Sequence, residues 1–421
     1  MRIAVIGSGI SGTSSAWLCA KAGHDTVLYE RDDRPGGHAR TLDIDYDGKQ
    51  IAVDTGFIVF NDRNYPNLLG LFEALNVPRH KSNMSFAASV NYAEYEYSSK
   101  SLLGIFPTIG SLFQPKRYLM IRDYLRFSKF AKAYLQNPDK RTLGQLVADS
   151  KVGDAFTRYF IMPMGAAIWS CPLSAMMDYP ARTFVQFFEN HGLLDWNGQP
   201  TWYTVTGGSK VYVQKLLDDA PIALRLSAGV NAVRRTGEGV EVEDADGKKE
   251  TYDHVIIAAH ADEALAMVER PTEAEKEILG AFRFQPNEAY LHRDDRLMPN
   301  NERCWASWVY LSDSAIDASP NLAVSYWMNL LQSIDNATPL FVTLNPFRKP
   351  NPELVFNQHT YTHPIFDEPA VSAQERMMEI NGTDSISYVG AWQRYGFHED
   401  GIFSAVRAVK KLGVPIPWEK E

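Results

Sequence analysis

Three glycines near the N-terminus have the spacing that brings a backbone turn against a phosphate. They stand in Gly7-Ser-Gly9-Ile-Ser-Gly12, directly after the apolar, β-branched run 2–6 and before a helical stretch over 11–22. Gly7 permits the tight turn, Gly9 removes the Cβ that would block a pyrophosphate, and Gly12 lets the helix lie close to the strand. The phosphate then meets the positive helix N-terminus, so the pattern predicts a dinucleotide site.

An acidic residue ends the next expected strand. Gly23 ends the helix, and the strand over 25–30 closes on Glu30, at about the 20-residue distance that is typical of nucleotide-binding folds. A carboxylate there accepts a hydrogen bond from a ribose hydroxyl and repels a 2′-phosphate, which disfavours a phosphorylated nicotinamide cofactor. We therefore expect an α/β, Rossmann-like domain. The fingerprint alone leaves FAD and NAD open.

The residues after Glu30 separate these two dinucleotides. The stretch Glu30-Arg31-Asp32-Asp33-Arg34-Pro35-Gly36-Gly37-His38-Ala39-Arg40-Thr41 resembles the second motif of the flavin-containing amine oxidase and phytoene desaturase superfamily. In that superfamily the glycine pair passes close to the FAD phosphates and the arginine lies beside the flavin. FAD is the cofactor that this resemblance implies.

Further stretches resemble motifs of the same superfamily in the expected order. They are Val53-Asp54-Thr55-Gly56, Val205-Thr206-Gly207-Gly208, 228–234, 252–259, and 388–392 followed by 398–401. The FAD-binding residues implied are Gly7, Gly9, Ser11, Gly12, Glu30, Arg31, Gly36, Gly37, His38, Arg40, Thr55, Gly56, Val233, Ala258, Gly390, His398, Gly401 and Ile402. Val233 is expected to meet the adenine through its backbone. His260 departs from the family, because relatives commonly carry threonine or proline there.

The positions of the motifs divide the chain. Blocks 1–80, 200–270 and 380–421 are expected to form one discontinuous FAD-binding domain. Blocks 81–199 and 271–379 then form an α+β substrate domain, which gives an amine-oxidase-like fold.

Few side chains are needed for catalysis, because a flavin supplies the redox chemistry itself. Histidine titrates near neutral pH and can handle the proton that accompanies a hydride. The catalytic candidates are His38, His398 and His260, with His363 as a further histidine, and hydrogen bonding to the cofactor is the open alternative for each. The sequence has neither metal-ligand spacing nor a Ser-His-Asp pattern, so we expect no metal site and no hydrolysis.

The segment 101–135 combines apolar residues with positive charge in a chain whose net charge is -9. Its basic residues are Lys116, Arg117, Arg122, Arg126, Lys129 and Lys132, and Asp123 is the acid among them. One interpretation is peripheral contact with an anionic membrane, in which apolar residues such as Leu102 and Phe113 enter the interface. The other is a helix of the substrate domain that packs its apolar face inward. The superfamily resemblance favours membrane contact.

A second apolar stretch is rich in methionine and aromatic residues. Its members are Phe156, Phe160, Met162, Met164, Ile168, Trp169, Met176, Met177, Phe184, Phe187 and Phe188. Such residues can line a tunnel for an acyl chain, although plain core is the more common role. A third aromatic group over 305–327 could form the floor of that cavity.

Composition limits the partners and the compartment. The charge balance lacks the cationic field that nucleic acids require, so no nucleic-acid partner is expected. The three cysteines, Cys19, Cys171 and Cys304, are far apart and fit a reducing compartment. No apolar stretch is long enough to cross a bilayer. We expect a cytoplasmic protein, at the inner face of the membrane if segment 101–135 makes the contact described above.

The motifs resemble more closely a bacterial subgroup of the superfamily associated with cyclopropane-fatty-acid-synthase-like methyltransferases, which includes acyl-lipid desaturases of furan fatty acid synthesis. The resemblance rests on Arg34–Thr41 and Val53–Asn61. It implies an FAD-dependent desaturase of a phospholipid-bound, methyl-branched, monounsaturated acyl chain that yields a conjugated diene. Double-bond isomerisation and amine oxidation are the enzymatic alternatives. The non-enzymatic alternative is a flavin-stabilised partner of an S-adenosylmethionine-dependent methyltransferase.

Overall fold

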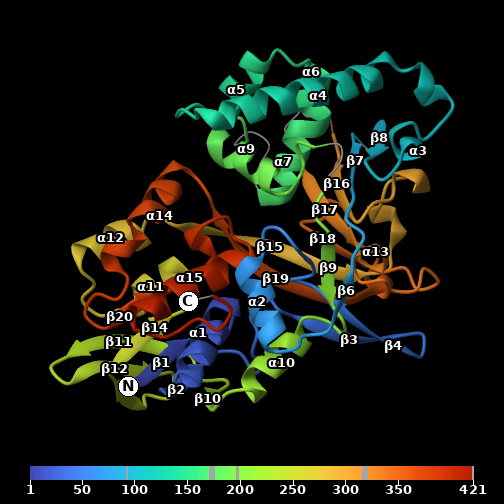
Figure 1. The fold of residues 1–421 in the computed structure, drawn as a ribbon. Coiled ribbons are helices and arrows are strands. Elements are labelled where there is room, and N and C mark those ends of the chain that lie inside the picture. Colours follow the sequence, from blue (N-terminus) through green and yellow to red (C-terminus); the bar gives the residue numbers. More distant parts are fainter. Residues whose placement is uncertain (92, 170–175, 196–198, 315–320, 420–421) are drawn as a thin grey trace.

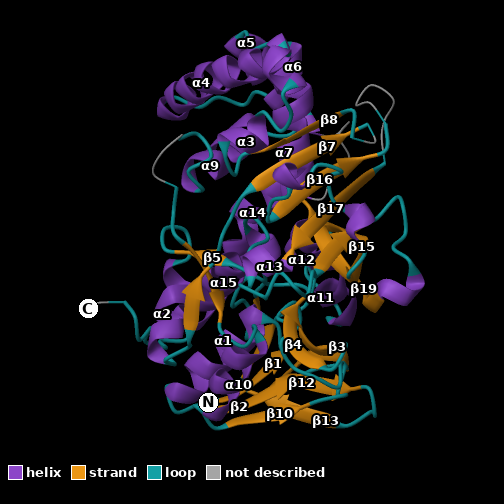
Figure 2. Ribbon diagram, turned by 90° about the vertical axis from the view of Figure 1, so that its right-hand side faces the viewer, coloured by secondary structure: helices purple, strands orange, loops and turns teal. Residues whose placement is uncertain are grey.

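Two sheets and a group of helices follow one another along the length of the molecule (Figure 1, Figure 2). The structure is a computed structural model, and it describes residues 1–421 apart from 92, 170–175, 196–198, 315–320 and 420–421. A parallel sheet lies at one end, a seven-stranded sheet in the middle, and a layer of helices at the other end. Cys19 and Cys304 are buried free thiols, whereas Cys171 lies outside the described residues.

The parallel sheet has five strands. In spatial order they are β10 (Ile222–Arg225), β2 (Asp25–Tyr29), β1 (Arg2–Ile6), β14 (His254–Ile257) and β20 (Ile386–Tyr388). All four neighbouring pairs are parallel. Parallel sheets are covered on both faces, which explains why these strands are almost continuously apolar. The strands come from all three sequence blocks predicted for the FAD-binding domain.

The two faces of this sheet pack into different cores. Ile3 and Val5 of β1 point into a core formed with α1 (Ile10–Lys21), α2 (Pro66–Ala74), α10 (Lys210–Asp218) and α15 (His398–Lys411). Ala4 and Ile6 point into the opposite core, because successive strand residues alternate between faces. The elements of that second core are β11 (Val230–Thr236), β12 (Gly239–Asp244), β13 (Lys249–Tyr252), α11 (Ala261–Met267), α12 (Glu273–Leu279) and α14 (Glu368–Ile380).

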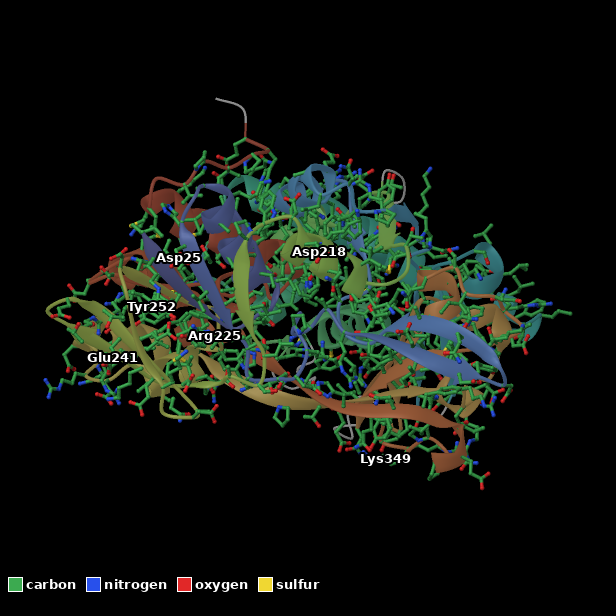
Figure 3. All side chains as sticks on the ribbon, turned by 90° about the horizontal axis from the view of Figure 1, so that it is seen from below. Asp25, Asp218, Arg225, Glu241, Tyr252 and Lys349 are labelled. Atoms are coloured by element: carbon green, nitrogen blue, oxygen red, sulfur yellow. The ribbon has the colours of Figure 1, made fainter. Side chains whose placement is uncertain are left out.

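Hydrogen bonds and an ion pair join the edge of the parallel sheet to the antiparallel sheet β11–β13. Figure 3 shows Arg225, from β10, and Tyr252, from β13, on the underside of this end of the molecule. Arg225 donates to the Tyr29 hydroxyl at 2.7 Å. The Tyr29 hydroxyl also lies 2.7 Å from the Tyr252 hydroxyl. The same guanidinium pairs with Glu250 at 2.8 Å. Three strands from distant parts of the chain are thereby fixed together.

The middle of the molecule is a mixed sheet of seven strands. Their order is β19 (Val355–Ile365), β15 (Arg283–His292), β18 (Phe341–Leu344), β17 (Leu322–Trp327), β16 (Trp308–Ser312), β7 (Phe86–Val90) and β8 (Tyr95–Ser98). The one parallel pair joins β16 to β7. The long strands β15 and β19 extend towards the parallel sheet and carry residues to the cavity described below (Figure 2).

The helical layer packs against the end of this sheet that includes β7 and β8 (Figure 1). Its elements are α3 (Leu102–Ile105), the turn η1 (Gly110–Phe113), α4 (Pro115–Gln136), α5 (Leu143–Ser150), α6 (Asp154–Phe156), the π-turn η2 (Thr157–Ile161), α7 (Met162–Trp169) and α9 (Ala181–Asn190). The inward face of α4 buries Met120, Phe127, Ala131 and Tyr134, which recur at helical spacing. Among the described residues, we find no helix whose length and hydropathy would let it span a membrane.

Smaller elements complete the chain. They are the hairpin β3 (Thr41–Tyr46) and β4 (Lys49–Asp54), the three strands β5 (Phe60–Asn61), β9 (Trp202–Val205) and β6 (Arg79–Lys81), helix α13 (Met328–Leu331), and the short turns η3 (Asp295–Leu297), η4 (Glu302–Cys304), η6 (Pro352–Leu354) and η7 (Ala391–Gln393). The hairpin and the three strands connect the nucleotide end to the middle sheet.

The predicted domain boundaries differ from the packing at two helices. Helices α12 and α14 lie in block 271–379, which the sequence assigned to the substrate domain. Their apolar residues, including Ile278 and Met377, nevertheless share a core with the parallel sheet. Amphipathic helices carry no signal for which sheet they will cover, so the motif positions could not place them.

Candidate active site

The turn after β1 has the geometry that a dinucleotide requires. Gly7 has φ +98°, and a Cβ on it would lie 2.7 Å from the carbonyl oxygen of Ala258. A Cβ on Gly12 would overlap the carbonyl oxygen of Gly7, so only glycine lets α1 approach the strand this closely. A Cβ on Gly9, by contrast, would meet no atom within 4 Å. The space in front of Gly9 is therefore open at the N-terminus of α1, where an anion is stabilised.

Glu30 is held in place at the end of β2. Its carboxylate accepts hydrogen bonds from the backbone N–H groups of Ser8 and Asp32, each at 2.9 Å, and from the Ser8 hydroxyl. The Ser8 hydroxyl oxygen in turn accepts from the N–H of Gly36 at 3.0 Å. The acid, the first glycine turn and the glycine pair are thus connected in one hydrogen-bonded unit.

A continuous cavity of about 1670 Å³ begins at this turn. It passes the middle strands β15 and β19 and ends between α3, α4 and the residues around α7. Pockets for a single small ligand have volumes of about 300–1,000 Å³. This cavity therefore has room for an elongated dinucleotide and a second, apolar ligand beyond it.

Thirteen of the predicted site residues line this cavity. They are Gly7, Gly9, Ser11, Glu30, Arg31, Gly37, His38, Thr55, Gly56, Ala258, His260, Gly390 and His398. They come from all three predicted FAD-binding blocks, so the fold brings together residues that are far apart in sequence. The histidine His363 lies in the wall as well.

The other predicted residues lie behind the wall. Gly12 and Gly36 shape the backbone as described above. Gly401 allows α15 to approach α1, because a Cβ on it would lie 2.7 Å from Ile10 and 2.8 Å from Ser11. Ile402 is fully buried in the core of the parallel sheet. These residues contribute to packing, and their contact with FAD stays a prediction.

Val233, which was predicted to meet the adenine, lies outside the cavity wall. Val233 is fully buried, its backbone pairs with Val242, and its carbonyl accepts the N–H of Glu269 at 2.9 Å. Val230, at the start of the same strand, lines the cavity instead. The register of β11 shifts between Val230 and Ala232, and this irregularity is invisible in the sequence pattern.

Arg40 was predicted to lie beside the flavin, and this contact stays a prediction. Its side chain is absent from the cavity wall, and it donates to the Asn357 side chain on β19 at 2.9 Å. The positive charge of Arg40 adds to burial in lowering the pKa of His359 on the same strand. Arg40 therefore ties the glycine loop to the middle sheet.

The comparisons with known proteins agree with this geometry. A family model described as flavin containing amine oxidoreductase matches residues 10–287, which is more than half of the chain. The chain belongs to this family. This amine oxidoreductase is 42% identical over 77 residues to a 15-cis-phytoene desaturase from Synechococcus elongatus, a match that covers 18% of the chain and 15% of that protein. It is 40% identical over 47 residues to an L-amino acid oxidase from Cerastes cerastes, covering 11% of the chain and 9% of that protein.

Solved structures share the fold over almost the whole length. A CLA-producing fatty acid isomerase from P. acnes superimposes with a TM-score of 0.68 at 13% identity, covering 97% of this chain and 98% of that one. A putrescine oxidase variant superimposes with a TM-score of 0.68 at 15% identity, covering 98% of both chains. These structures confirm the predicted fold class, and the family model confirms the superfamily.

FAD is the cofactor of this amine oxidoreductase, since the family is flavin-containing. The residues present fit that group. The open space at Gly9 would admit the pyrophosphate, and the Glu30 carboxylate would accept a hydrogen bond from a ribose hydroxyl. Among the described residues, no cluster of histidine, cysteine and carboxylate side chains is arranged to hold a metal ion.

The four candidate histidines have different surroundings. His398 stacks on Phe57 at 3.7 Å between ring centroids, and its Nε2 lies 3.1 Å from the Tyr212 hydroxyl. Burial lowers the pKa of His398 to about 3. His260 stacks on Phe284 at 4.3 Å, and burial lowers its pKa as well. These contacts indicate positioning roles for both rings.

The rings of His38 and His363 lie side by side in the cavity wall, with centroids 5.5 Å apart. The amide of Asn287 donates to His363 Nδ1 at 3.1 Å, because the Asn287 oxygen already accepts from Asn345. The proton of neutral His363 is therefore on Nε2. Burial lowers the pKa of His363 to about 4. His363 is a hydrogen-bond donor towards the cavity.

The His38 ring makes no hydrogen bond to any residue within the described part of the chain. Burial, followed by the neighbouring His363, holds the pKa of His38 well below its usual value. The ring is neutral at pH 7, so one of its nitrogens carries a lone pair that can accept a proton from a ligand. Among the four histidines, His38 as the base stays a prediction.

Sequence reasoning named His363 but missed the rest of strand β19. His359, Tyr361 and His363 alternate along it and all line the cavity. The Tyr361 ring lies 4.9 Å from the His38 ring, and its hydroxyl lies 2.8 Å from that of Thr55. Alternation along a strand was the available signal. The pairing of this strand with the glycine loop depends on long-range packing, which no local pattern reports.

Proposed function

We propose that this flavin-dependent oxidoreductase desaturates a phospholipid-bound fatty acyl chain. The proposed substrate is methyl-branched and monounsaturated, and the product is a conjugated diene of the kind needed for furan fatty acid synthesis. The observation that carries the proposal is the continuous cavity, whose outer half is lined mainly by apolar side chains. Its described lining there includes Met120, Ile121, Phe156, Phe160, Met164 and Ile168.

An apolar tunnel suits an acyl chain and disfavours a charged amine. The outer half of the described wall contains one carboxylate, Asp195, and this group pairs with Lys132 at 2.6 Å. A cationic amine entering there would lose its hydration without gaining an unpaired carboxylate. The aromatic residues Trp308 and Tyr326 of the middle sheet also line the cavity and are stacked at 6.0 Å.

The residues around His38 provide what the reaction needs from the protein. Bound FAD would accept a hydride from the allylic carbon of the substrate. The neutral His38 ring takes the proton from the adjacent carbon, and the new C=C bond forms from the electron pair left behind. The apolar wall excludes water from the reacting carbons. Hydride and proton together make the product two hydrogens lighter than the substrate.

Isomerisation is the second candidate, and the similar fold of a fatty acid isomerase favours its consideration. In that reaction the hydride would return to another carbon, so the mass would stay unchanged. The experiment supplies the holoenzyme and an artificial electron acceptor with methyl-branched, monounsaturated acyl phospholipid, and in parallel with an amine panel. A lipid product two hydrogens lighter supports desaturation. An unchanged lipid mass with a moved double bond, or turnover of amines alone, would refute the proposal.

A non-enzymatic role predicts a third result. A flavin-stabilised partner of an S-adenosylmethionine-dependent methyltransferase would bind that enzyme and leave all of these substrates unchanged. The open, unpaired His38 ring beside an apolar tunnel favours an enzyme, because a structural flavin needs neither a free base nor a route for an acyl chain.

A further inference from the structure

A cluster of exposed apolar side chains covers one end of the helical layer. Eleven large hydrophobic side chains are exposed among the described residues, and eight of them belong to α3, η1, α4 and their connections. We call this cluster the docking surface. Its members are Leu102, Leu103, Ile109, Leu112, Phe113, Tyr118, Leu119 and Leu125. A concentration of this kind marks an interaction site, whereas scattered single residues do not.

The docking surface is held in its exposed conformation. The Ser101 hydroxyl caps α3 by accepting the N–H of Gly104 at 3.1 Å. The buried Arg117 side chain donates to the carbonyl oxygens of Ile105 at 2.6 Å and Glu96 at 3.0 Å, which ties α3 to α4 and β8. Ile109 and Phe113, which follow, are each 80% exposed. The Tyr118 hydroxyl donates to the Leu112 carbonyl oxygen at 2.8 Å, which ties the turn between them to α4.

Positive charge surrounds the apolar residues. The outward face of α4 carries Arg122, Arg126 and Lys129 in addition to Leu119 and Leu125. The acid in this helix, Asp123, is buried, pairs with Arg122 and accepts the N–H of Gly153. The chain as a whole has a net charge of -9, so this face has the opposite sign to the rest of the molecule. Basic and apolar residues together are typical of surfaces that bind anionic bilayers.

The cavity opens within the docking surface. Leu102 is 68% exposed and also lines the cavity, as do its neighbours Lys100 and Ser101. The tunnel that begins at the glycine turn therefore reaches solvent beside α3. An acyl chain in a bilayer in contact with this surface would lie directly at the tunnel entrance.

We propose that the docking surface binds the head-group region of an anionic phospholipid bilayer and admits the acyl substrate beside α3. The entry of the acyl chain rests on the proposed function, whereas bilayer binding does not. A second copy of this chain is a poorer occupant, because a two-fold contact would oppose Arg122, Arg126 and Lys129 to themselves. An anionic bilayer pairs its head groups with the basic residues and also buries the apolar side chains.

The test is vesicle flotation of the purified holoenzyme. Vesicles are made of phosphatidylcholine alone or of equal parts phosphatidylcholine and phosphatidylglycerol. We expect binding to the anionic vesicles to be at least tenfold stronger, and to weaken when salt is raised from about 0.05 to 0.5 M. The double variant Ile109→Ser/Phe113→Ser should lose at least tenfold in vesicle affinity, because two inserted side chains are removed.

A matched control is available on other faces of the molecule. Leu226 and Met378 are each 38% exposed and lie outside the docking surface, so Leu226→Ser/Met378→Ser should bind vesicles like the wild type. Equal vesicle binding by the wild type and Ile109→Ser/Phe113→Ser would overturn the proposal. Conversion of a wild-type dimer to a monomer by that variant, without binding to vesicles, would overturn it in favour of self-association.

Activity in detergent separates this proposal from the proposed function. With acyl lipid in micelles, the wild type and Ile109→Ser/Phe113→Ser should reduce FAD equally fast, because docking is bypassed. The variant should be at least tenfold slower with the same lipid in vesicles. Absence of reduction in micelles by both proteins would refute the proposed function, while the vesicle-binding result would still decide the docking surface.

Discussion

Two neighbouring glycine-to-alanine substitutions should have opposite effects on folding and cofactor binding. In Gly9→Ala the new Cβ meets no protein atom within 4 Å, and the backbone at φ -62° and ψ 178° suits alanine. In Gly12→Ala the new Cβ overlaps the carbonyl oxygen of Gly7, a backbone atom that cannot rotate away. The first change therefore fills the space intended for the pyrophosphate, whereas the second forces α1 away from β1.

The magnitudes follow from these surroundings. Gly9→Ala should cost at most about 1 kcal/mol of stability without cofactor, because alanine is a poorer helix N-cap than glycine. Loss of one charge-assisted hydrogen bond to phosphate costs about 1.5–3 kcal/mol, which lowers FAD affinity roughly 10- to 100-fold. Gly12→Ala should cost about 3 kcal/mol of stability, at the upper end of overpacking effects, because the obstacle is backbone.

Urea unfolding of the apoprotein and FAD titration by flavin fluorescence separate the two effects. Gly237→Ala is the control, because a Cβ there also meets nothing within 4 Å but lies in the distant β11–β12 turn. It should leave both quantities unchanged. Wild-type FAD affinity in Gly9→Ala, or equal stability of Gly9→Ala and Gly12→Ala, would refute the proposed geometry of the phosphate site.

Two further predictions concern histidines. His38→Gln should keep FAD bound yet slow its anaerobic reduction by acyl lipid at least 100-fold, as expected for loss of a general base. His398→Gln should slow this reduction less. Equal stopped-flow rates for the two variants would exclude His38 as the base. His254 and His292 are buried, and burial lowers each pKa from 6.5 to about 4. Since the unfolded chain takes up these protons first, stability that is complete above pH 6.5 should fall as pH decreases towards 4, by up to about 1.4 kcal/mol per pH unit for each histidine. Urea midpoints of His254→Gln should depend less steeply on pH over this range, and an unchanged slope would contradict the assignment.

The sequence predicts the nucleotide end well because its signals are local. These signals are the glycine turn, the helix after it and Glu30, which lie within 30 residues. Each of these residue types is required by its local conformation in any nucleotide-binding fold. The α/β fold class and FAD are confirmed. In β11, Val230 rather than Val233 lines the cavity, because the irregularity in this strand changes the register without changing the apolar pattern. Contact of Val233 with the adenine stays a prediction.

Segment 101–135 shows what spacing alone cannot decide. Of the two interpretations, inward packing holds for Met120 and Phe127, which are buried in the core. Leu119 and Leu125 nevertheless face outward among the basic residues. The mixture of apolar and basic side chains on the outer face of α4 can be recognised only once the position of the core shows which side of the helix is buried. Membrane contact itself stays a prediction.

The methionine-rich stretch combines both roles considered for it. Phe156 and Met164 belong to the buried core and also line the tunnel, so core and wall are the same residues. The side chain of Trp169 lies outside what the structure describes. Composition alone cannot distinguish a tunnel wall from a solid core, because both consist of apolar side chains.

Anaerobic single turnover tests the central claim most directly. The holoenzyme is mixed without oxygen with methyl-branched, monounsaturated acyl phospholipid, the flavin absorbance is followed, and the lipid is then extracted for mass analysis. Desaturation by bound FAD predicts loss of the oxidised flavin spectrum together with one lipid molecule, two hydrogens lighter, per flavin reduced. A flavin spectrum and a lipid that both remain unchanged would contradict the account.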